Sequence, residues 1–472
     1  MKSDNMEKNQ AIIIGVVAVI VVVIVAILLI NPFGGGGGGD DPQAGDRVGE
    51  IVAEKDWPSD KCRLWVYGNA NEDDKLDNAD VTALEGMIKG SVKWTQLADA
   101  NADGEVTQAD IDQVKAMIAA KSDTKLRVYY LDNYFKVAKV DWPVKTFATG
   151  FSSGYYASEV AGACDKIVLV DQMMYDGWAK LNESTADVET FGWTEEPDWE
   201  AILASNVDVY VPGYFDHAAD QIAAEKLKGI DVMFMNTSDN EFVDVPNEHI
   251  DRSTVTFAYL IQGDMTRAYK WLDWHDSVLS KLQSAAAKVK DKAYMIQART
   301  DPAHASGGKY MFTGLKQTNN IHAEWAGIYA VGNHDKTMST SNYPNLTMEE
   351  IVTIIDANHD KSNVIYFVDN ENAGIVQYRE LATCVDNWID TMGKTNTKIY
   401  WLGMTRELGN SPLYLIEMIF YQNIMYPELS AQTGLDYWEE LEYFIDNFTD
   451  DPELYDKYVD RDEWFLNIGF VS

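Results

Sequence analysis

The stretch TRAYKWLDWHDSVLSKLQSAAAKV, residues 266–289, decides the architecture of this chain. It belongs to a mostly helical region, from about residue 253 to 290, which Gly263 interrupts. A helix over residues 266–289 is about 36 Å long. Segments on both sides alternate between short β-rich runs and helical stretches. The sequence therefore predicts an α/β protein with two lobes around one long helix.

Strand candidates lie on both sides of this helix. The β-rich runs before it are residues 144–149, 166–170, 207–212 and 231–236, and those after it are 293–298, 363–368 and 398–403. Because helical stretches separate these runs, we expect mostly parallel sheets.

Two twelve-residue stretches, NANEDDKLDNAD (69–80) and DANADGEVTQAD (99–110), have the residue spacing of a calcium loop. Such a loop uses oxygens at positions 1, 3 and 5, a backbone carbonyl at 7, a water or side chain at 9, and a carboxylate at 12. The second stretch supplies Asp99, Asn101, Asp103, the carbonyl of Glu105, Thr107 and Asp110. The first supplies Asn69, Asn71, Asp73, the carbonyl of Lys75, Asp77 and Asp80.

The two loops differ at the sharp turn. Gly104 lies there in the second loop, whereas Asp74 takes its place in the first. We expect Asp74 to adopt a positive φ at a cost of about 1 kcal/mol, which would weaken the first site. An amphipathic helical segment follows each loop, at residues 81–88 and 111–118. The alternative interpretation is a pair of acidic turns without an ion.

Aspartate at position 12, together with this pairing, resembles a dockerin module over about residues 64–120. The resemblance implies calcium as the cofactor and a cohesin-bearing protein as a partner. We call residues 61–121 the paired-loop module.

Residues 11–30, AIIIGVVAVIVVVIVAILLI, contain no charge. A helix of this length spans about 30 Å, the thickness of a bilayer's hydrocarbon core. It is longer than the apolar region of a secretory signal, about 7 to 15 residues. Lys2 and Lys8 precede it. We therefore expect a cytoplasmic tail (1–10), a single-pass anchor in the cell membrane (11–30), a Gly-rich flexible linker (31–60) and an ectodomain outside.

Composition excludes several classes of function. The chain has 38 basic and 75 acidic residues, a net charge of −37, which repels phosphate backbones and excludes nucleic acid as a partner. Its three cysteines are far apart in sequence, so no disulfide framework is expected. Seven histidines show no zinc motif, and the absence of a phosphate-binding loop motif means that the chain is not an ATPase.

The order of segments from about residue 127 to 448 resembles the class III periplasmic binding proteins, the substrate-binding proteins of ABC importers for metal chelates. SGYYASEVAGACDKIVLVDQ (153–172) resembles the family's opening strand, helix and second strand, and 266–289 its spine helix. The resemblance implies lobe 1 at residues 122–252, connecting helices at 253–290 and lobe 2 at 291–472. It further implies a non-enzymatic receptor that captures a ferric siderophore, haem or cobalamin for an importer permease.

The family docks onto its permease through one glutamate on each lobe. The matching positions are Glu200 in PDWEAI and Glu349 in TMEEIV, with Glu350 replacing Glu349 if the register shifts by one. The alternative is that each is an ordinary exposed helix carboxylate.

A chelate cleft needs flat apolar walls and a few polar anchors. The resemblance places the candidates near strand ends, with arginine suited to anionic groups of the chelate. They are Tyr155, Tyr156, Tyr175, Trp193, Tyr214 and Phe215 in lobe 1, and Arg299, Trp401 and Arg406 in lobe 2.

Two other functions compete with this interpretation. Residues 150–154, GFSSG, fit the nucleophile motif of a serine hydrolase, with Ser152 as nucleophile and His217, His249 or His304 as its base. The motif comes too early in the α/β region for such an enzyme, and a tight glycine turn explains it more simply. The third class is a cell-surface scaffold or adhesion protein that binds cohesin.

Overall fold

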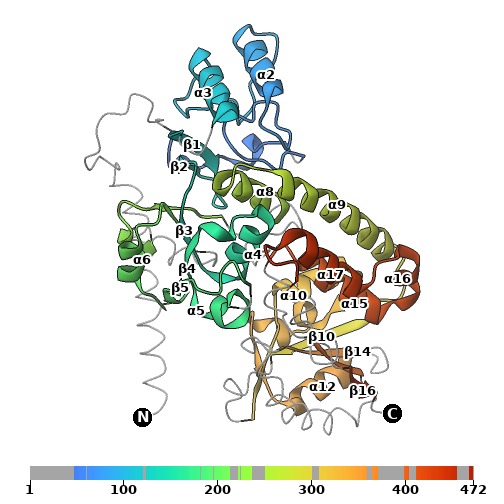
Figure 1. Ribbon diagram of the computed structural model, residues 1–472. Helices are drawn as coiled ribbons and strands as arrows, with labels where there is room; N and C mark the ends of the chain where they lie inside the picture. The colour runs from blue at the N-terminus through green and yellow to red at the C-terminus, as the bar shows by residue number, and fades with distance from the viewer. Residues whose placement is uncertain are drawn as a thin grey trace, which may run out of the picture. The chain divides into compact units, whose positions relative to one another are not determined.

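The long central helix and the two flanking sheets are present in the computed structural model (Figure 1). Helix α8 (Ile250–Ile261) and helix α9 (Thr266–Ala286) are separated at Gly263, as predicted. Gly263 has a φ of +75°, and a Cβ there would lie 3.0 Å from the Trp142 ring. The buried residues of α9 recur every three or four positions, so one face of the helix joins the core.

The structure describes residues 47–59, 61–120, 124–180, 182–194, 196–212, 222–223, 225–235, 250–299, 308–358, 364–369, 398–402, 411–453 and 467–470. In these ranges no helix combines the length and the apolar character needed to cross a bilayer. The anchor predicted at residues 11–30 lies outside the described residues, and it stays a prediction.

The first sheet has five parallel strands in the order β5-β4-β3-β8-β9. Its strands are β3 (Phe147–Thr149), β4 (Ile167–Val170), β5 (Glu189–Thr190), β8 (Val209–Val211) and β9 (Asp231–Val232). The intervening helices and turns are α4 (Phe151–Ala161), η2 (Cys164–Lys166), α5 (Gln172–Met174), η3 (Tyr175–Ala179) and α6 (Trp199–Ser205). A small hairpin pairs β6 (Gly192–Trp193) with β7 (Glu196–Pro197). Four strand predictions in lobe 1 are thus confirmed in position, although each observed strand is shorter.

The second sheet has the order β13-β11-β10-β14-β15-β16, with β12 also pairing with β10. Its strands are β10 (Tyr294–Arg299), β11 (Tyr310–Phe312), β12 (Tyr329–Ala330), β13 (Asn345–Leu346), β14 (Val364–Asp369), β15 (Lys398–Leu402) and β16 (Asn467–Phe470). The pairings of β11, β13 and β16 are antiparallel. The predicted strands β10, β14 and β15 are confirmed. Four strands that the sequence did not reveal join them, and three of these, β11, β13 and β16, make the sheet mixed because they pair antiparallel.

Seven described helices accompany the second sheet. They are α10 (Thr318–Trp325), α11 (Val331–His334), η4 (Met338–Thr340), α12 (Met348–Asn358), α15 (Tyr414–Met425), α16 (Pro427–Thr433) and α17 (Tyr437–Phe448). Helices α15, α16 and α17 contact α9, and α17 also contacts α4. The last helices that the structure describes therefore pack against the spine, and one of them, α17, also packs against α4 of the first sheet.

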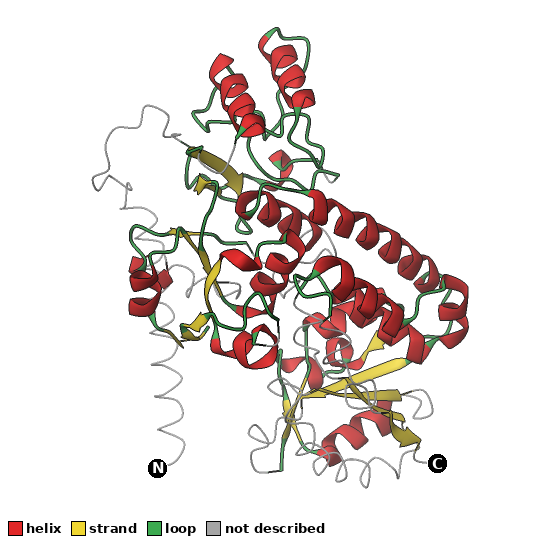
Figure 2. Ribbon diagram, viewed as in Figure 1, coloured by secondary structure: helices red, strands yellow, loops and turns green. Residues whose placement is uncertain are grey.

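The paired-loop module contains two helices, α2 (Asn78–Ile88) and α3 (Gln108–Ala119), and each begins within the last three residues of its loop (Figure 2). An antiparallel hairpin, β1 (Leu126–Leu131) with β2 (Val137–Trp142), follows the module. Leu64, Val66 and Met117 belong to the same buried core as α4 and α8. The module is thus packed into the larger body of the protein rather than separated from it by a linker.

The prediction of a flexible linker through residue 60 is wrong for residues 47–59. Val52 is buried, and Trp57 stacks on Phe135 with ring centroids 4.0 Å apart. The short helix η1 (Glu54–Asp56) lies between Val52 and Trp57 in the sequence. Apolar side chains in this polar stretch find partners on the β1–β2 hairpin, which only the folded chain brings close.

Candidate functional site

The carboxyl edge of the first sheet is a candidate binding site. The chain winds from β3 to β4 and β5 on one side and to β8 and β9 on the other, so β3 and β8 flank a topological switch point. Ligands of open α/β sheets bind at this place, beyond the carboxyl ends of the strands. Gly150 follows β3, and its N–H donates to the Val211 carbonyl at 3.0 Å. A Cβ at Gly150 would lie 2.7 Å from the Pro212 carbonyl oxygen, so only glycine fits between these strand ends.

A buried carboxylate ties the strand ends together. Asp171 follows β4 and has no exposed surface. Its side chain accepts the Phe151 N–H at 2.5 Å, the Met174 N–H at 2.7 Å, and the hydroxyl of Thr194. Phe151 has a φ of +61°, a strained conformation that such a network holds in place. The sequence interpretation missed Asp171 and Thr194, although an aspartate directly after a strand (IVLVD) was an available signal.

Among the predicted wall residues of lobe 1 that the structure describes, Trp193 alone is clearly open to solvent. It lies in β6, beside buried Thr194, with 52% of its surface exposed. Tyr175 is half-buried, and its hydroxyl donates to the Ala186 carbonyl at 3.1 Å. Because Asp171 holds Thr194, the neighbouring Trp193 places an exposed indole next to the carboxyl edge of the sheet.

Tyr155 and Tyr156 do not line an open cleft. Both lie on α4 with no exposed surface. The hydroxyl of Tyr155 is 2.9 Å from the Thr185 hydroxyl, and the two tyrosine rings contact each other edge to face. Every residue of α4 is buried, so these two rings pack in the protein core. The prediction that they form walls of the ligand cleft is therefore wrong.

The lobe 2 candidates are only partly described. Trp401 lies in β15 opposite Val368 of β14, as predicted, whereas Arg299, expected just after its strand, is the last residue of β10. The structure does not describe their side chains. Tyr214, Phe215 and Arg406 lie outside the described residues, as do His217, His249 and His304.

The predicted docking glutamates are both exposed in the first turn of a helix. Glu200 lies in α6, which Asp198 caps, and Glu349 lies in α12. Glu350 instead accepts the Thr347 N–H at 2.8 Å, and this bond lowers the pKa of its carboxyl. Because Glu350 is used in capping, the geometry favours Glu349 as the surface carboxylate of lobe 2.

The two candidate calcium loops close in the same way. The position-12 carboxylate of Asp80 accepts the N–H of Asn71 at 3.1 Å and of Asp77 at 2.8 Å. Asp110 accepts the corresponding N–H groups, those of Asn101 at 3.3 Å and Thr107 at 2.7 Å. Burial raises the pKa of Asp80 to about 6 and also raises that of Asp110. A bound cation would compensate these buried charges.

The expected positive φ at Asp74 is wrong. The positive φ values lie instead at position 4, with 52° at Glu72 and 53° at Ala102, and at Gly104. Asp74 keeps an ordinary backbone, and its side chain binds Arg63 instead, with Nη2 and Oδ2 2.7 Å apart. The argument that turn strain weakens the first site therefore fails.

Position 1 distinguishes the loops in another way. Asn69 is fully buried, and its Nδ2 donates to the Leu64 carbonyl at 2.8 Å and to the Asp73 carbonyl at 2.5 Å. Its Oδ1 has no hydrogen-bond partner in the part of the chain that the structure describes. Asp99, at the same position of the second loop, pairs with Arg47 at 3.1 Å and accepts the Gly104 N–H at 2.9 Å. An orphaned buried oxygen at a ligand position fits a cation in the first loop.

The GxSxG stretch is a packing turn. Ser152 has no exposed surface. A Cβ at Gly154 would lie 2.2 Å from the Thr149 hydroxyl, so the helix approaches the strand closely, as the glycine-turn interpretation predicts.

Comparison with known proteins supports the fold. No family model and no curated protein matches the sequence. The TroA-like periplasmic binding protein FepB from Veillonella parvula matches with a TM-score of 0.52 and 14% identity, over 72% of this chain and 99% of FepB. A second periplasmic solute-binding protein of that organism gives 0.52 and 15%, over 73% and 98%. CeuE of Helicobacter pylori, solved with Ni(II) bound, gives 0.50 and 15%, over 71% and 99%. The chain thus has the α/β fold of TroA-like periplasmic binding proteins.

Proposed function

We propose that this chain, with the fold of TroA-like periplasmic binding proteins, is the substrate-binding protein of an ABC importer and captures a metal chelate. The observation that carries the proposal is the carboxyl edge of the first sheet. There Asp171 fixes three chain segments, and Trp193 presents an exposed indole beside them. A rigid edge with one flat apolar wall suits a ferric siderophore, haem or cobalamin.

The proposed receptor binds its ligand and does not transform it. Ser152, the nucleophile of the competing hydrolase, is buried inside α4. Glu200 and Glu349 are proposed to dock onto the permease, since both are exposed in a first helical turn.

The paired loops are proposed to hold calcium. Asn69, Asn71, Asp73, Asp77 and Asp80, with the Lys75 carbonyl, would form the first site, and Asp99, Asn101, Asp103, Thr107 and Asp110, with the Glu105 carbonyl, the second. Bound calcium would supply charge that the buried carboxylates lack. With the anchor at residues 11–30, this proposal gives a membrane-held ectodomain with a calcium-dependent docking module, for which a cohesin-bearing protein is the proposed partner.

Titration of the full chain with haemin, cobalamin and a ferric siderophore, followed by tryptophan fluorescence, tests the proposal. We expect saturable binding of at least one chelate and, for Trp193→Ala, an affinity lower by about tenfold or more. Trp94→Ala is the matched control, because Trp94 is also 52% exposed but lies in the paired-loop module. Absence of saturation by all three chelates, or equal affinities for the two variants, would contradict this assignment.

A further inference from the structure

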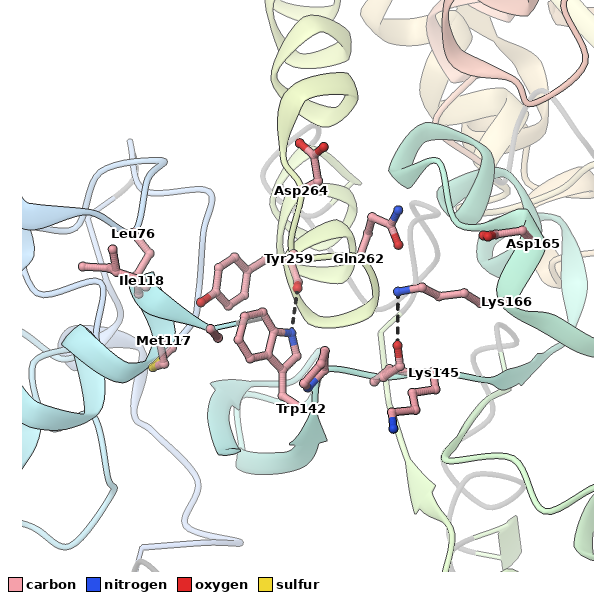
Figure 3. A pocket seen from close by; sticks show the side chains of 14 residues that line it. Leu76, Met117, Ile118, Trp142, Lys145, Asp165, Lys166, Tyr259, Gln262 and Asp264 are labelled. Atoms are coloured by element: carbon pink, nitrogen blue, oxygen red, sulfur yellow. Dashed lines mark hydrogen bonds between the residues drawn. The ribbon is translucent and has the colours of Figure 1, made fainter. Parts of the chain in front are cut away.

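A pocket of about 670 Å³ lies where the paired-loop module meets the start of the first sheet and the end of α8 (Figure 3). Residues 142–145 and 165–166 line it, and they precede β3 and β4. The pocket therefore lies at the amino ends of these strands, opposite to the carboxyl edge proposed for the chelate. Its volume is within the range of small-molecule sites, about 300 to 1,000 Å³.

One part of the pocket is apolar. Met117 and Ile118 enter from α3 of the module. Trp142 and Tyr259 stack with ring centroids 5.4 Å apart and ring planes 8° apart. The Trp142 indole N–H donates to the Tyr259 carbonyl at 3.1 Å, which fixes the stack in place (Figure 3). This wall is rigid and suits an apolar ring or chain.

The other part carries a partly buried cation. Lys166 Nζ donates to the Val144 carbonyl at 3.1 Å and to the Ile261 carbonyl at 2.7 Å. These bonds use two of its three N–H groups, and burial lowers the pKa of the ammonium. A carboxylate on a ligand would use the third N–H and restore part of the solvation that the ammonium has lost.

Two polar atoms of pocket residues lack a partner among the described residues. They are the hydroxyl oxygen of Tyr259, whose side chain is 5% exposed, and Oε1 of Gln262. A buried polar group without a hydrogen bond costs about 1 to 3 kcal/mol, so such groups usually have a partner. Gln262 Oε1 is a hydrogen-bond acceptor, so an N–H donor on the bound molecule would satisfy it. The Tyr259 hydroxyl can donate or accept.

We propose that this pocket binds an apolar amino acid, free or at the carboxyl end of a peptide. Its side chain would lie against Trp142 and Tyr259, its carboxylate would pair with Lys166, and its N–H would donate to Gln262. The site is separate from the proposed chelate site, and it joins the module to the first sheet through a ligand that contacts both.

Isothermal titration of the full chain tests this site with N-acetylphenylalanine, free phenylalanine and the dipeptide Phe-Phe. We expect saturable binding of the first compound, and about tenfold weaker binding of both its uncharged amide and 3-phenylpropionate, which lacks the N–H. Tighter binding of Phe-Phe than of free phenylalanine would identify a peptide end, whereas the reverse order would identify a free amino acid.

Three variants locate the binding. Lys166→Met removes the cation, and Ile118→Asp places a charge on the apolar wall at a residue that is 38% exposed and therefore tolerant of change. Each should weaken N-acetylphenylalanine about tenfold or more, whereas Lys281→Met, at an exposed position of α9, should change affinity by less than about twofold. Thermal unfolding confirms that each variant is folded. No saturation by any compound up to about 5 mM, or affinity unchanged by Ile118→Asp, would overturn the proposal.

Discussion

Glu159 is a fully buried carboxyl of the first lobe. It lies on α4 without exposed surface, where it accepts the Asp450 N–H at 2.7 Å and the Asn182 Nδ2 at 2.5 Å. Burial, aided by the nearby negative charge of Asp450, raises the pKa of Glu159 to about 7. The side chain thus joins α4 to the segment after α17, and in the folded state it loses its proton only around neutral pH.

This shift predicts a pH-dependent stability. The folded protein binds the Glu159 proton more tightly than the unfolded chain, whose glutamate pKa is about 4.3. The stabilisation is complete below that value and is lost as pH rises through about 7, by on the order of 3 kcal/mol. Urea unfolding at several pH values should show the decline in wild type and a shallower one in Glu159→Gln. Glu439→Gln, at an exposed position, should retain the wild-type slope, and a parallel decline in both variants would contradict the assignment.

At the scale of elements, one arginine connects the first candidate calcium loop to the spine helix. Arg63 Nη1 lies 2.7 Å from Asp276 of α9, while its Nη2 lies 2.7 Å from Asp74 of the loop. The Tyr269 hydroxyl of α9 also donates to the Asp74 carbonyl at 2.8 Å. The loop and the spine therefore share a network of charge-assisted hydrogen bonds, which are stronger than neutral ones.

Removing this connection should destabilise the protein. We expect Arg63→Ala to lower the free energy of unfolding by about 2 kcal/mol, because it leaves Asp74 and the partly buried Asp251 without their cation. Arg127→Ala is the control: its partner Asp141 is 69% exposed, and such surface pairs contribute about 1 kcal/mol or less. If the two variants lose the same free energy of unfolding in denaturant titrations, the Arg63 network stabilises the protein no more than a surface ion pair does.

At the scale of the whole molecule, capture and delivery of ligand are proposed to use different surfaces. The double variant Glu200→Ala/Glu349→Ala should leave chelate affinity unchanged and reduce ligand-stimulated ATP hydrolysis by the reconstituted importer about tenfold. Glu439→Ala is a suitable control, since Glu439 is also exposed in a first helical turn. A loss of chelate affinity in the double variant would mean that these glutamates do not act in docking.

Calcium is proposed to serve partner binding rather than chelate binding. Replacing Asp99 and Asp103 by alanine should abolish calcium-dependent binding of a cohesin-bearing partner, measured by surface plasmon resonance with and without a chelator. Chelate affinity should stay within about twofold of wild type. If both activities disappear while the variant remains folded, the two functions are not separable.

Local signals in the sequence were sufficient for the helices and central strands. The spine begins at Thr266 as predicted, and β4, β10, β14 and β15 agree with their predicted segments within a residue or two. The spacing of apolar residues specifies these elements, because each element buries one face and the residues of that face recur at a regular interval along the sequence. The matching closure of the two candidate loops by Asp80 and Asp110 also follows a contiguous pattern of residues, whereas calcium binding itself stays a prediction.

Contacts between distant segments decided the rest. The sequence did not distinguish buried Tyr155 and Tyr156 from exposed Trp193, because burial of α4 depends on α8, α9 and α17 packing around it. Arg63 meets Asp276 across 213 positions of sequence, and no local pattern specifies that pair. The sequence alone thus determined the spine helix and the central strands of both sheets. Only the tertiary structure decided which polar and aromatic side chains face solvent, since exposure depends on what packs against them.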